Sequence, residues 1–336
     1  MEQRNGNSED EGQHREGEPE NQEREPGTEG PSGPDDSSDS EIPSAPNDQQ
    51  QPFGPFEEPE PPEFSAAQME AELFGPPPGL FDRINNYMLL LYAVACLFMY
   101  YSIAGFLMLS DQVALALSLP SIITFILPLY VLTKRLSLRF TGEYRLHPPQ
   151  SFMTILTILI AGSAVLPVDI ISSYFERWWP PDEDYIKFLL AIKPKGFWSF
   201  IGIAFGTVIA GPVAEEFLFR GFIQRIFQRN MKGSYAVLLG GIVFGASHLD
   251  MAVIPGVTLL GILFGYMFFR TGNLIYPILG HSLYNLVSLI RLHLTPASAL
   301  EAGEVPGASP IWVLAAVLAF MLGIFLLEIR HRDVKP

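Results

Sequence analysis

The chain has 336 residues, and its formal net charge of −15 is unevenly distributed. Residues 1–80 carry 21 acidic and 3 basic residues, whereas residues 81–336 carry 15 acidic and 18 basic ones. An acidic segment followed by a nearly neutral, apolar one offers no basic surface for phosphate, so no nucleic-acid partner is expected. Cys96 is the only cysteine, which excludes an intrachain disulfide and a cysteine-rich zinc site.

The first predicted element is a tail, residues 1–80. It contains 14 of the 29 prolines, with mainly Glu, Gln, Ser, Gly, Asn and Asp besides. Such a composition buries too little apolar surface to offset the entropy of ordering the chain, so the tail is predicted to be disordered. Residues 1–30 lack a basic stretch followed by an apolar one, so no signal peptide is expected. Residues 81–336 are predicted to form one membrane domain.

Apolar runs dominate this second part of the chain. A helix needs about 20 apolar residues to cross ~30 Å of hydrocarbon. The predicted fold class is therefore all-α, a polytopic membrane bundle of about eight transmembrane helices behind the disordered tail. The shortest runs predict helices that are broken, tilted or extended by their flanks. The runs are 87–109, 113–132, 151–172, 198–218, 234–249, 252–269, 274–290 and 311–328.

Lysine and arginine concentrate in alternate connections between these runs. The connection 133–150 and the residues after 328 are rich in them, whereas 176–185 is acidic and carries Trp178 and Trp179, which suit a membrane interface. This bias predicts that both termini are cytoplasmic. We expect an integral multi-pass protein of the cell (inner) membrane in a prokaryote or of an ER-type membrane in a eukaryote. The bias is softened by Lys187, Lys193, Lys195 and Arg291.

Polar side chains within the apolar runs are few, and most of them form helical pairs. Glu216 and Arg220 are four residues apart, so they share a helix face and can form an ion pair. Glu215 lies about 100° around the helix from Glu216 and must face different neighbours. Asp169, near the end of its run, is explained by contact with water.

Two further pairs follow at the same spacing, Phe244 with His248 and His281 with Asn285. Taken singly, a histidine in a membrane helix usually bonds a neighbouring helix, and a Glu–Arg pair near a helix end is usually structural. Two acids, two imidazoles and an amide, as consecutive polar interruptions of an otherwise apolar segment, instead favour convergence around water, a metal ion or both.

The ordered set of pairs resembles a known family. The patterns E-E-x-x-x-R (215–220), F-x-x-x-H (244–248) and H-x-x-x-N (281–285) occur in the order of the three motifs of the CPBP family. This family comprises the CAAX prenyl protease type II and bacteriocin-processing (Abi) proteins, which are intramembrane proteases. The resemblance covers about residues 195–292, and the acidic tail is not part of the family pattern.

The resemblance implies an intramembrane endopeptidase in which Glu215 and His248 activate a water molecule. His281 and Asn285 would face the same cavity and donate hydrogen bonds to the oxyanion at the scissile carbonyl. A carboxylate in a low-dielectric pocket is a competent general base. The expected partners are the lipid bilayer and a protein or peptide substrate, which in eukaryotic relatives is lipid-modified.

The resemblance also places Glu216 and Arg220 in the catalytic group, as the pair that orients the helix presenting Glu215. One Zn²⁺ is a possible cofactor, held by Glu215, His248 and His281, since zinc accepts imidazole nitrogen and carboxylate oxygen. The sequence lacks the helical zinc motif H-E-x-x-H, so a mechanism without metal stays open.

Two alternative functions remain open. Membrane-embedded Glu, Arg and His also mark the pathways of ion- or proton-coupled transporters. The apolar runs show no inverted repeat with matching broken helices, which counts mildly against a transporter. The second alternative is a non-catalytic membrane scaffold or immunity protein.

Helix geometry raises one difficulty for bringing Glu215 and His248 together. With straight helices, Glu215 lies toward the cytoplasmic end of run 198–218, whereas His248 lies about 21 Å along the next run. The two meet only if the first helix continues well past residue 218 or the next begins further out. The glycine pairs at four-residue spacing are predicted to serve helix packing; they are Gly202/Gly206, Gly241/Gly245 and Gly261/Gly265.

Overall fold

The computed structural model describes residues 79–301 and 309–333. These residues all belong to one compact unit, 64–336. The tail predicted to be disordered falls outside the described residues except at its end. There α2 (Leu80–Arg83) begins the bundle, because Leu80 and Phe81 are buried in its core.

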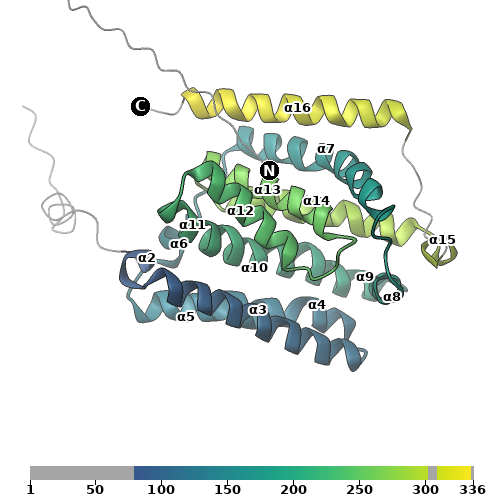
Figure 1. Cartoon of the computed structure of the whole chain (residues 1–336), viewed down its shortest axis with the longest axis horizontal. Helices are drawn as coiled ribbons and strands as arrows, with labels where there is room; N and C mark the ends of the chain where they lie inside the picture. Colours follow the sequence, from purple (N-terminus) through teal and green to yellow (C-terminus); the bar gives the residue numbers. More distant parts are fainter. Residues whose placement is uncertain (1–78, 302–308, 334–336) are drawn as a thin grey trace, which may run out of the picture. The chain divides into compact units, whose positions relative to one another are not determined.

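Every predicted apolar run forms a helix (Figure 1), and no strand occurs within residues 79–301 and 309–333. The fold is all-α, as predicted. Short helices join the long ones: α6 (Phe140–Glu143), α8 (Glu183–Ile192) and α15 (Ala297–Glu301). The long single helices are α3 (Asn86–Leu109), α7 (Ser151–Glu176), α12 (Gly233–Ala246), α13 (Ile254–Thr271), α14 (Ile275–Leu294) and α16 (Pro310–Asp333).

Two further membrane helices contain π-helical turns. One runs from α4 (Val113–Ser121) through η1 (Ile122–Ile126) into α5 (Leu127–Arg135). The other is one helix of 34 residues, Phe197–Asn230. Its parts are α9 (Phe197–Ala204), η2 (Phe205–Ala210), α10 (Gly211–Leu218), η3 (Phe219–Ile223) and α11 (Gln224–Asn230).

Six of the eight predicted spans are long and apolar enough to cross a membrane. The chain is therefore an integral multi-pass membrane protein. The other two runs are helical but differ from the expectation. The 14 residues of α12 reach only about 21 Å, less than the ~30 Å of a hydrocarbon core. Helix α14 is 20 residues long, but it carries His281, Asn285 and Arg291 among its apolar residues.

The length of the helix Phe197–Asn230 removes the difficulty raised by straight-helix geometry. This helix continues twelve residues past 218 before it turns into α12. Glu215 and His248 therefore lie 15 residues before Asn230 and 15 after Gly233, or about 22 Å from the same turn on either side. The two side chains reach a similar depth because the turn is further out than the apolar run suggested.

Close helix packing accounts for the predicted glycine pairs, two of which lie on α12 and α13. A Cβ atom on Gly241 would come within 2.7 Å of the Ile262 backbone nitrogen, and one on Gly261 within 2.8 Å of the Gly241 carbonyl oxygen. On the helix Phe197–Asn230, a Cβ atom on Gly206 would lie 2.7 Å from Leu117 Cβ. These glycines let helix backbones approach to distances that no larger residue allows.

Asp169 is not simply exposed to water, as its position had suggested. Its carboxylate forms an ion pair with Arg291 of α14, which joins the C-terminal part of α7 to α14. A second ion pair, between Arg270 and Glu328 at 2.6 Å, joins α13 to α16. Both pairs join charges of neighbouring helices toward the ends of the bundle.

Candidate functional site

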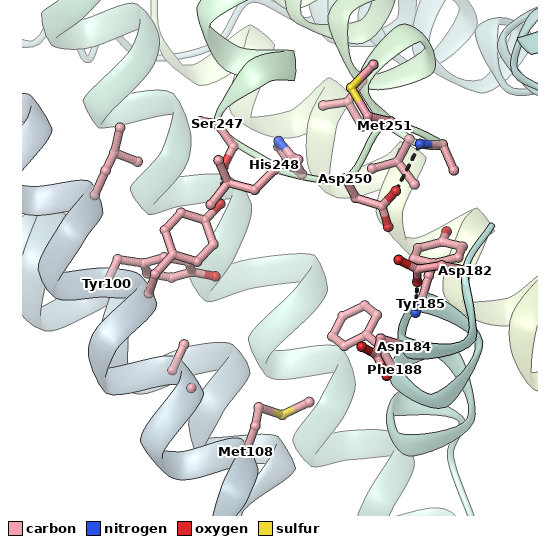
Figure 2. Close-up of a pocket in the computed structure, with 18 of the residues that line it drawn as sticks. Tyr100, Met108, Asp182, Asp184, Tyr185, Phe188, Ser247, His248, Asp250 and Met251 are labelled. Carbon is pink, nitrogen blue, oxygen red and sulfur yellow. Dashed lines mark hydrogen bonds between the residues drawn. The ribbon is translucent and has the colours of Figure 1, made fainter. Parts of the chain in front are cut away.

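A cavity of about 880 Å³ lies beside the middle of the helix Phe197–Asn230 (Figure 2). Its walls are mainly apolar and come from α3, α4, α8 and the segment 247–253, which links α12 to α13. Glu215 and His248 both line it, and so do Asp182, Asp184 and Asp250. Proteins usually bind their ligands in cavities of this size and character.

Tyr185 of α8 also lines the cavity. Burial, followed by the negative charges of Asp250 and Glu176, raises the pKa of this phenol to about 12. The hydroxyl is therefore neutral at physiological pH and available for hydrogen bonds. The cavity wall thus combines carboxylates with a neutral phenol.

The two glutamates are positioned by a helix interrupted on both sides by π-helical turns. Pro212 has no amide hydrogen to donate within the helix, and the π-helical η2 ends just before it. The second such turn, η3, begins at Phe219. Single π-helical turns within α-helices occur frequently at functional sites. Here they bracket α10, which carries Glu215 and Glu216.

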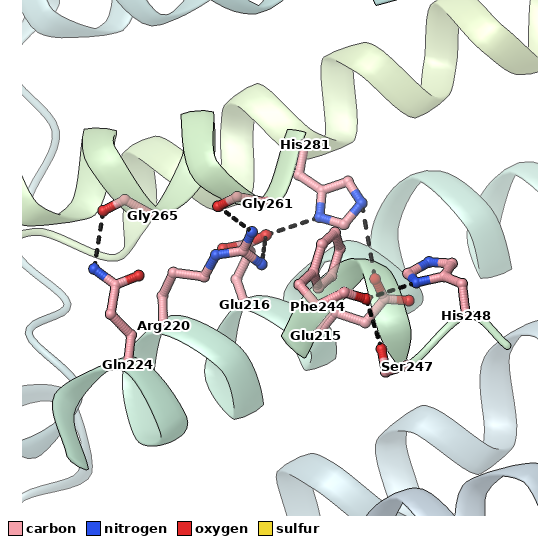
Figure 3. A network of polar contacts seen from close by, with 10 residues as sticks. All are labelled: Glu215, Glu216, Arg220, Gln224, Phe244, Ser247, His248, Gly261, Gly265 and His281. Atoms are coloured by element: carbon pink, nitrogen blue, oxygen red, sulfur yellow. Dashed lines mark hydrogen bonds and ion pairs between the residues drawn. The ribbon is translucent and has the colours of Figure 1, made fainter. Parts of the chain in front are cut away.

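Glu216 and Arg220 form the predicted ion pair in the interior of the bundle (Figure 3). Arg220 Nη1 lies 2.8 Å from Glu216 Oε1, and Nη2 donates to the Gly261 carbonyl oxygen at 3.1 Å. The guanidinium also lies over the ring of Phe244, 4.3 Å from its centroid. Glu216 and Arg220 are 0% and 1% exposed. The pair is thus sealed from the cavity and holds helices together.

His281 links the two glutamates. Its Nδ1 lies 2.9 Å from Glu216 Oε1, and its Nε2 lies 3.9 Å from Glu215 Oε2. Since a carboxylate oxygen only accepts, Nδ1 carries a proton and donates to Glu216. His281 also stacks on Phe264, with ring centroids 5.1 Å apart. The imidazole is thereby fixed with Nε2 toward Glu215.

His248 is held on the turn that ends α12. Its Nδ1 lies 2.9 Å from the Phe244 carbonyl oxygen, which can only accept, so Nδ1 is protonated. In the neutral imidazole, Nε2 then carries the free lone pair. The following residue, Leu249, adopts φ 58°, an unusual conformation for a bulky side chain. The backbone reverses directly after His248 and leaves the imidazole at the cavity wall.

The amide of Asn285 has a different environment from the one expected. Its Nδ2 donates to the Thr207 carbonyl oxygen of η2 at 2.8 Å. Neither Asn285 nor His281 is among the described residues that line the cavity. In this conformation Asn285 supports the π-helical turn that precedes α10.

The three residues proposed for zinc do not form a metal site. Within the described part of the chain, no group of three or more His, Cys, Asp and Glu side chains is arranged to hold a metal ion. The hydrogen bonds of His281 Nδ1 to Glu216 and of His248 Nδ1 to a carbonyl oxygen leave both Nε2 atoms free, which is the usual state of metal-ligating histidines. The tautomers would therefore suit zinc, but the described side chains do not converge as a set of three ligands.

Residues from outside the three patterns complete the site. Tyr101 of α3 donates a hydrogen bond to the Ser247 carbonyl oxygen, and Tyr100 beside it lines the cavity and stacks on Phe125. Gln224 donates to the Gly265 carbonyl oxygen at 2.9 Å, one helical turn beyond the Arg220 contact. Its four-residue spacing from Arg220 was a usable signal in the sequence. No such signal exists in the sequence for the tyrosines, because α3 is more than 100 residues distant from the glutamates.

A comparison with known proteins finds a family match for the middle of the chain. Residues 197–287 match the family model of the type II CAAX prenyl endopeptidases, described as Rce1-like. This confirms the resemblance read from the three patterns. The match contains α9 to α13 and the first part of α14, and it does not include α3, α4, α8 or α16.

A curated relative, the "Putative membrane peptidase YdiL" of Bacillus subtilis (strain 168), is 29% identical over 82 residues. The aligned part is 24% of this chain and 34% of the relative, so the chain covers about a third of the length of that protein. No solved structure matches the chain.

Proposed function

We propose that the protein is an intramembrane endopeptidase that hydrolyses a peptide bond in the 880 Å³ cavity, with Glu215 as the general base. One observation carries this proposal. Of the two adjacent glutamates, Glu216 is fully buried in an ion pair, whereas the side chain of Glu215 is 22% exposed and lines the cavity beside His248. The matched family and the name of the relative support a peptidase rather than a transporter.

The proposed reaction begins with a water molecule in the cavity near Glu215. The carboxylate accepts a proton from the water, whose oxygen attacks the scissile carbonyl carbon. His248 presents Nε2 to the same space and can accept a hydrogen bond from the water. The proton taken up by Glu215 is then delivered to the leaving amine, and the product carboxylate and amine separate.

Glu216, Arg220 and His281 position the base in this proposal. Arg220 balances the charge of Glu216, and Glu216 orients His281 through Nδ1. His281 in turn directs Nε2 toward Glu215. In a water-poor site such a chain of fixed dipoles is effective because it does not reorganise during the reaction.

The substrate is proposed to be a polypeptide segment that reaches the cavity within the bilayer. Apolar walls from α3 and α4 suit an extended apolar segment or a lipid-modified one. A prenylated substrate is the expectation from the family description. The apolar walls alone do not distinguish a prenyl group from apolar side chains.

The test is cleavage by the purified full chain in proteoliposomes. The probes are a fluorogenic farnesylated C-a-a-X peptide and the same peptide without the lipid. The matched control is Glu215→Gln, which keeps the shape of the side chain but cannot act as a base. In parallel, membrane proteomes of cells with the wild-type protein and with Glu215→Gln are compared for proteins that accumulate uncut. Loss of cleavage in Glu215→Gln supports the proposal. Equal cleavage by both proteins, or no difference between the proteomes when neither probe is cut, contradicts it.

Metal dependence is tested separately, because zinc was expected from the resemblance. Cleavage is measured after dialysis against a chelator and after zinc is added back. The metal-free mechanism proposed here predicts an unchanged rate. A loss that zinc restores would require Glu215, His248 and His281 to rearrange into a metal site.

A further inference from the structure

The described contacts define two ends of the bundle. At one end, Arg225 is paired with Glu143, and Asn86 with Asn230. The Leu274 amide donates to the Arg145 carbonyl oxygen at the same end. We call this the closed end, because the cavity does not reach it. It consists of residues 79–86, 134–150, 225–233, 270–275 and 328–330.

At the other end, Tyr101 contacts Ser247, and Arg291 is paired with Asp169. Lys193 donates to the carbonyl oxygens of Leu292 and His293, 2.7 and 2.8 Å away. The cavity extends to this end, because residues of α8 and of the segment 247–253 line it (Figure 2), whereas no residue of the closed end does. We call it the mouth end. It consists of residues 110–112, 177–196, 247–253 and 291–301.

The two ends differ twofold in basic residues. The closed end carries ten lysines and arginines, and the mouth end carries five. Those of the closed end are Arg83, Lys134, Arg135, Arg139, Arg145, Arg225, Arg229, Lys232, Arg270 and Arg330. Those of the mouth end are Arg177, Lys187, Lys193, Lys195 and Arg291.

Membrane proteins retain their lysine- and arginine-rich short loops on the cytoplasmic side. Every connection between described helices is short enough for this rule to apply. The charge distribution therefore places the closed end in the cytoplasm.

Tryptophan marks the membrane level at the mouth end. All four tryptophans of the chain lie there or within the first helical turn beyond it, and all are between 48% and 82% exposed. Trp residues collect where the hydrocarbon meets the headgroups. The tryptophans are Trp178, Trp179, Trp198 and Trp312.

We infer that the cavity opens to the non-cytoplasmic side of the membrane, so that its occupant is a polypeptide segment delivered from that side. The identity of the occupant as a substrate rests on the proposed function, whereas the direction of opening does not. Translocated or secreted chains, and the non-cytoplasmic flanks of other membrane helices, meet this requirement. A lipid-modified chain anchored to the cytoplasmic leaflet does not meet it, so the proposed substrate narrows to segments without such an anchor.

Single cysteines test the direction of opening without any substrate. Cys96 is buried, so replacing it by alanine gives a cysteine-free background. Asp184→Cys places a thiol at the mouth, and Lys232→Cys places one at the closed end; both positions are exposed. Each variant is treated with a membrane-impermeant maleimide in spheroplasts and in inverted vesicles, relative to labelling in detergent.

Asp184→Cys is expected to label at least ten times faster in spheroplasts than in inverted vesicles, and Lys232→Cys is expected to show the reverse. The opposite pattern, or equal labelling of the two variants in spheroplasts, overturns the inference.

A matched cleavage experiment adds the unmodified, impermeant peptide to the same two preparations. Cleavage in spheroplasts alone supports delivery from the non-cytoplasmic side, and cleavage in inverted vesicles alone overturns it. Correct labelling with no cleavage in either preparation contradicts the proposed function but leaves the direction of opening established.

Discussion

Glu215 and Glu216 are neighbours in sequence but have opposite surroundings. Glu216 Oε1 receives hydrogen bonds from Arg220 and His281, and its Oε2 is buried without a hydrogen-bond partner among the described residues. Glu215 is directed to the cavity. The 100° step between consecutive helical residues is sufficient to place one carboxylate in a buried ion pair and the other at the cavity.

Replacing Glu215 by Gln is expected to abolish cleavage while leaving the melting temperature nearly unchanged, because the buried Arg220 is hydrogen-bonded to Glu216 and not to this carboxylate. Replacing Glu216 by Gln is expected to lower the free energy of unfolding by about 3–5 kcal/mol, since it leaves Arg220 buried without its counter-charge. Melting curves in detergent and cleavage rates in proteoliposomes measure the two effects. Equal melting temperatures for the two variants would contradict the distinction.

A second substitution separates charge from shape at this pair. Arg220→Met added to Glu216→Gln removes the unpaired cation and fills similar volume beside Phe244. The double variant is expected to regain part of the lost stability but not the cleavage rate, because His281 has still lost its ionised partner. A double variant that melts below Glu216→Gln would show that Arg220 stabilises the fold mainly through Gly261.

At the scale of elements, α12 and α13 form the most closely packed pair of helices near the site. Gly241 and Gly261 face each other there, and the Arg220 hydrogen bond ends on the Gly261 carbonyl oxygen. The position of the Arg220 guanidinium, and with it the pair with Glu216, thus depends on how closely these two helices approach. Packing and site geometry are set by the same contact.

Gly241→Ala is expected to destabilise the protein by about 1–3 kcal/mol, the usual range for overpacking. The added methyl group would meet the Ile262 backbone at 2.7–3.0 Å, where no side chain can move aside. Gly162→Ala on α7 is the matched control, because its added methyl group would lie 3.9 Å from Leu283 Cδ2, an ordinary contact. Unfolding in detergent followed by circular dichroism compares the two. A control variant that loses as much stability as Gly241→Ala would indicate a general loss of glycine rather than a close contact.

At the scale of the whole molecule, the bundle begins at Leu80, which is fully buried, and Phe81, which packs against Phe222. A chain that begins at residue 79 is expected to melt like the full protein. One that begins at Asp82 loses two buried apolar side chains, each stabilising by about 1.5–3 kcal/mol, and is expected to melt several degrees lower. Melting curves of the three proteins provide the comparison. A lower melting point for the chain beginning at 79 would show that residues before it stabilise the bundle.

The sequence alone predicted the helical fold and the Glu216–Arg220 pair, because apolar length and four-residue spacing are local properties. It did not predict the π-helical turns around α10, which depend on how Pro212 is accommodated in a longer helix. The sequence alone also did not predict the depth of His248, since the turn at 230–233 lies outside the apolar runs. Tyr101 and the walls of the cavity come from helices distant in sequence, and no local pattern marks such contacts.

The contact between Tyr101 and Ser247 has a consequence for biogenesis. Membrane helices insert first and associate afterwards. Until α3 and α4 dock, the cavity has only part of its wall, and the turn bearing His248 lacks its contact with α3. The newly inserted chain therefore lacks a complete cavity, and under the proposed function we expect cleavage only after lateral assembly is complete. Such a delay would protect nascent neighbours at the insertion site while the chain is still being made.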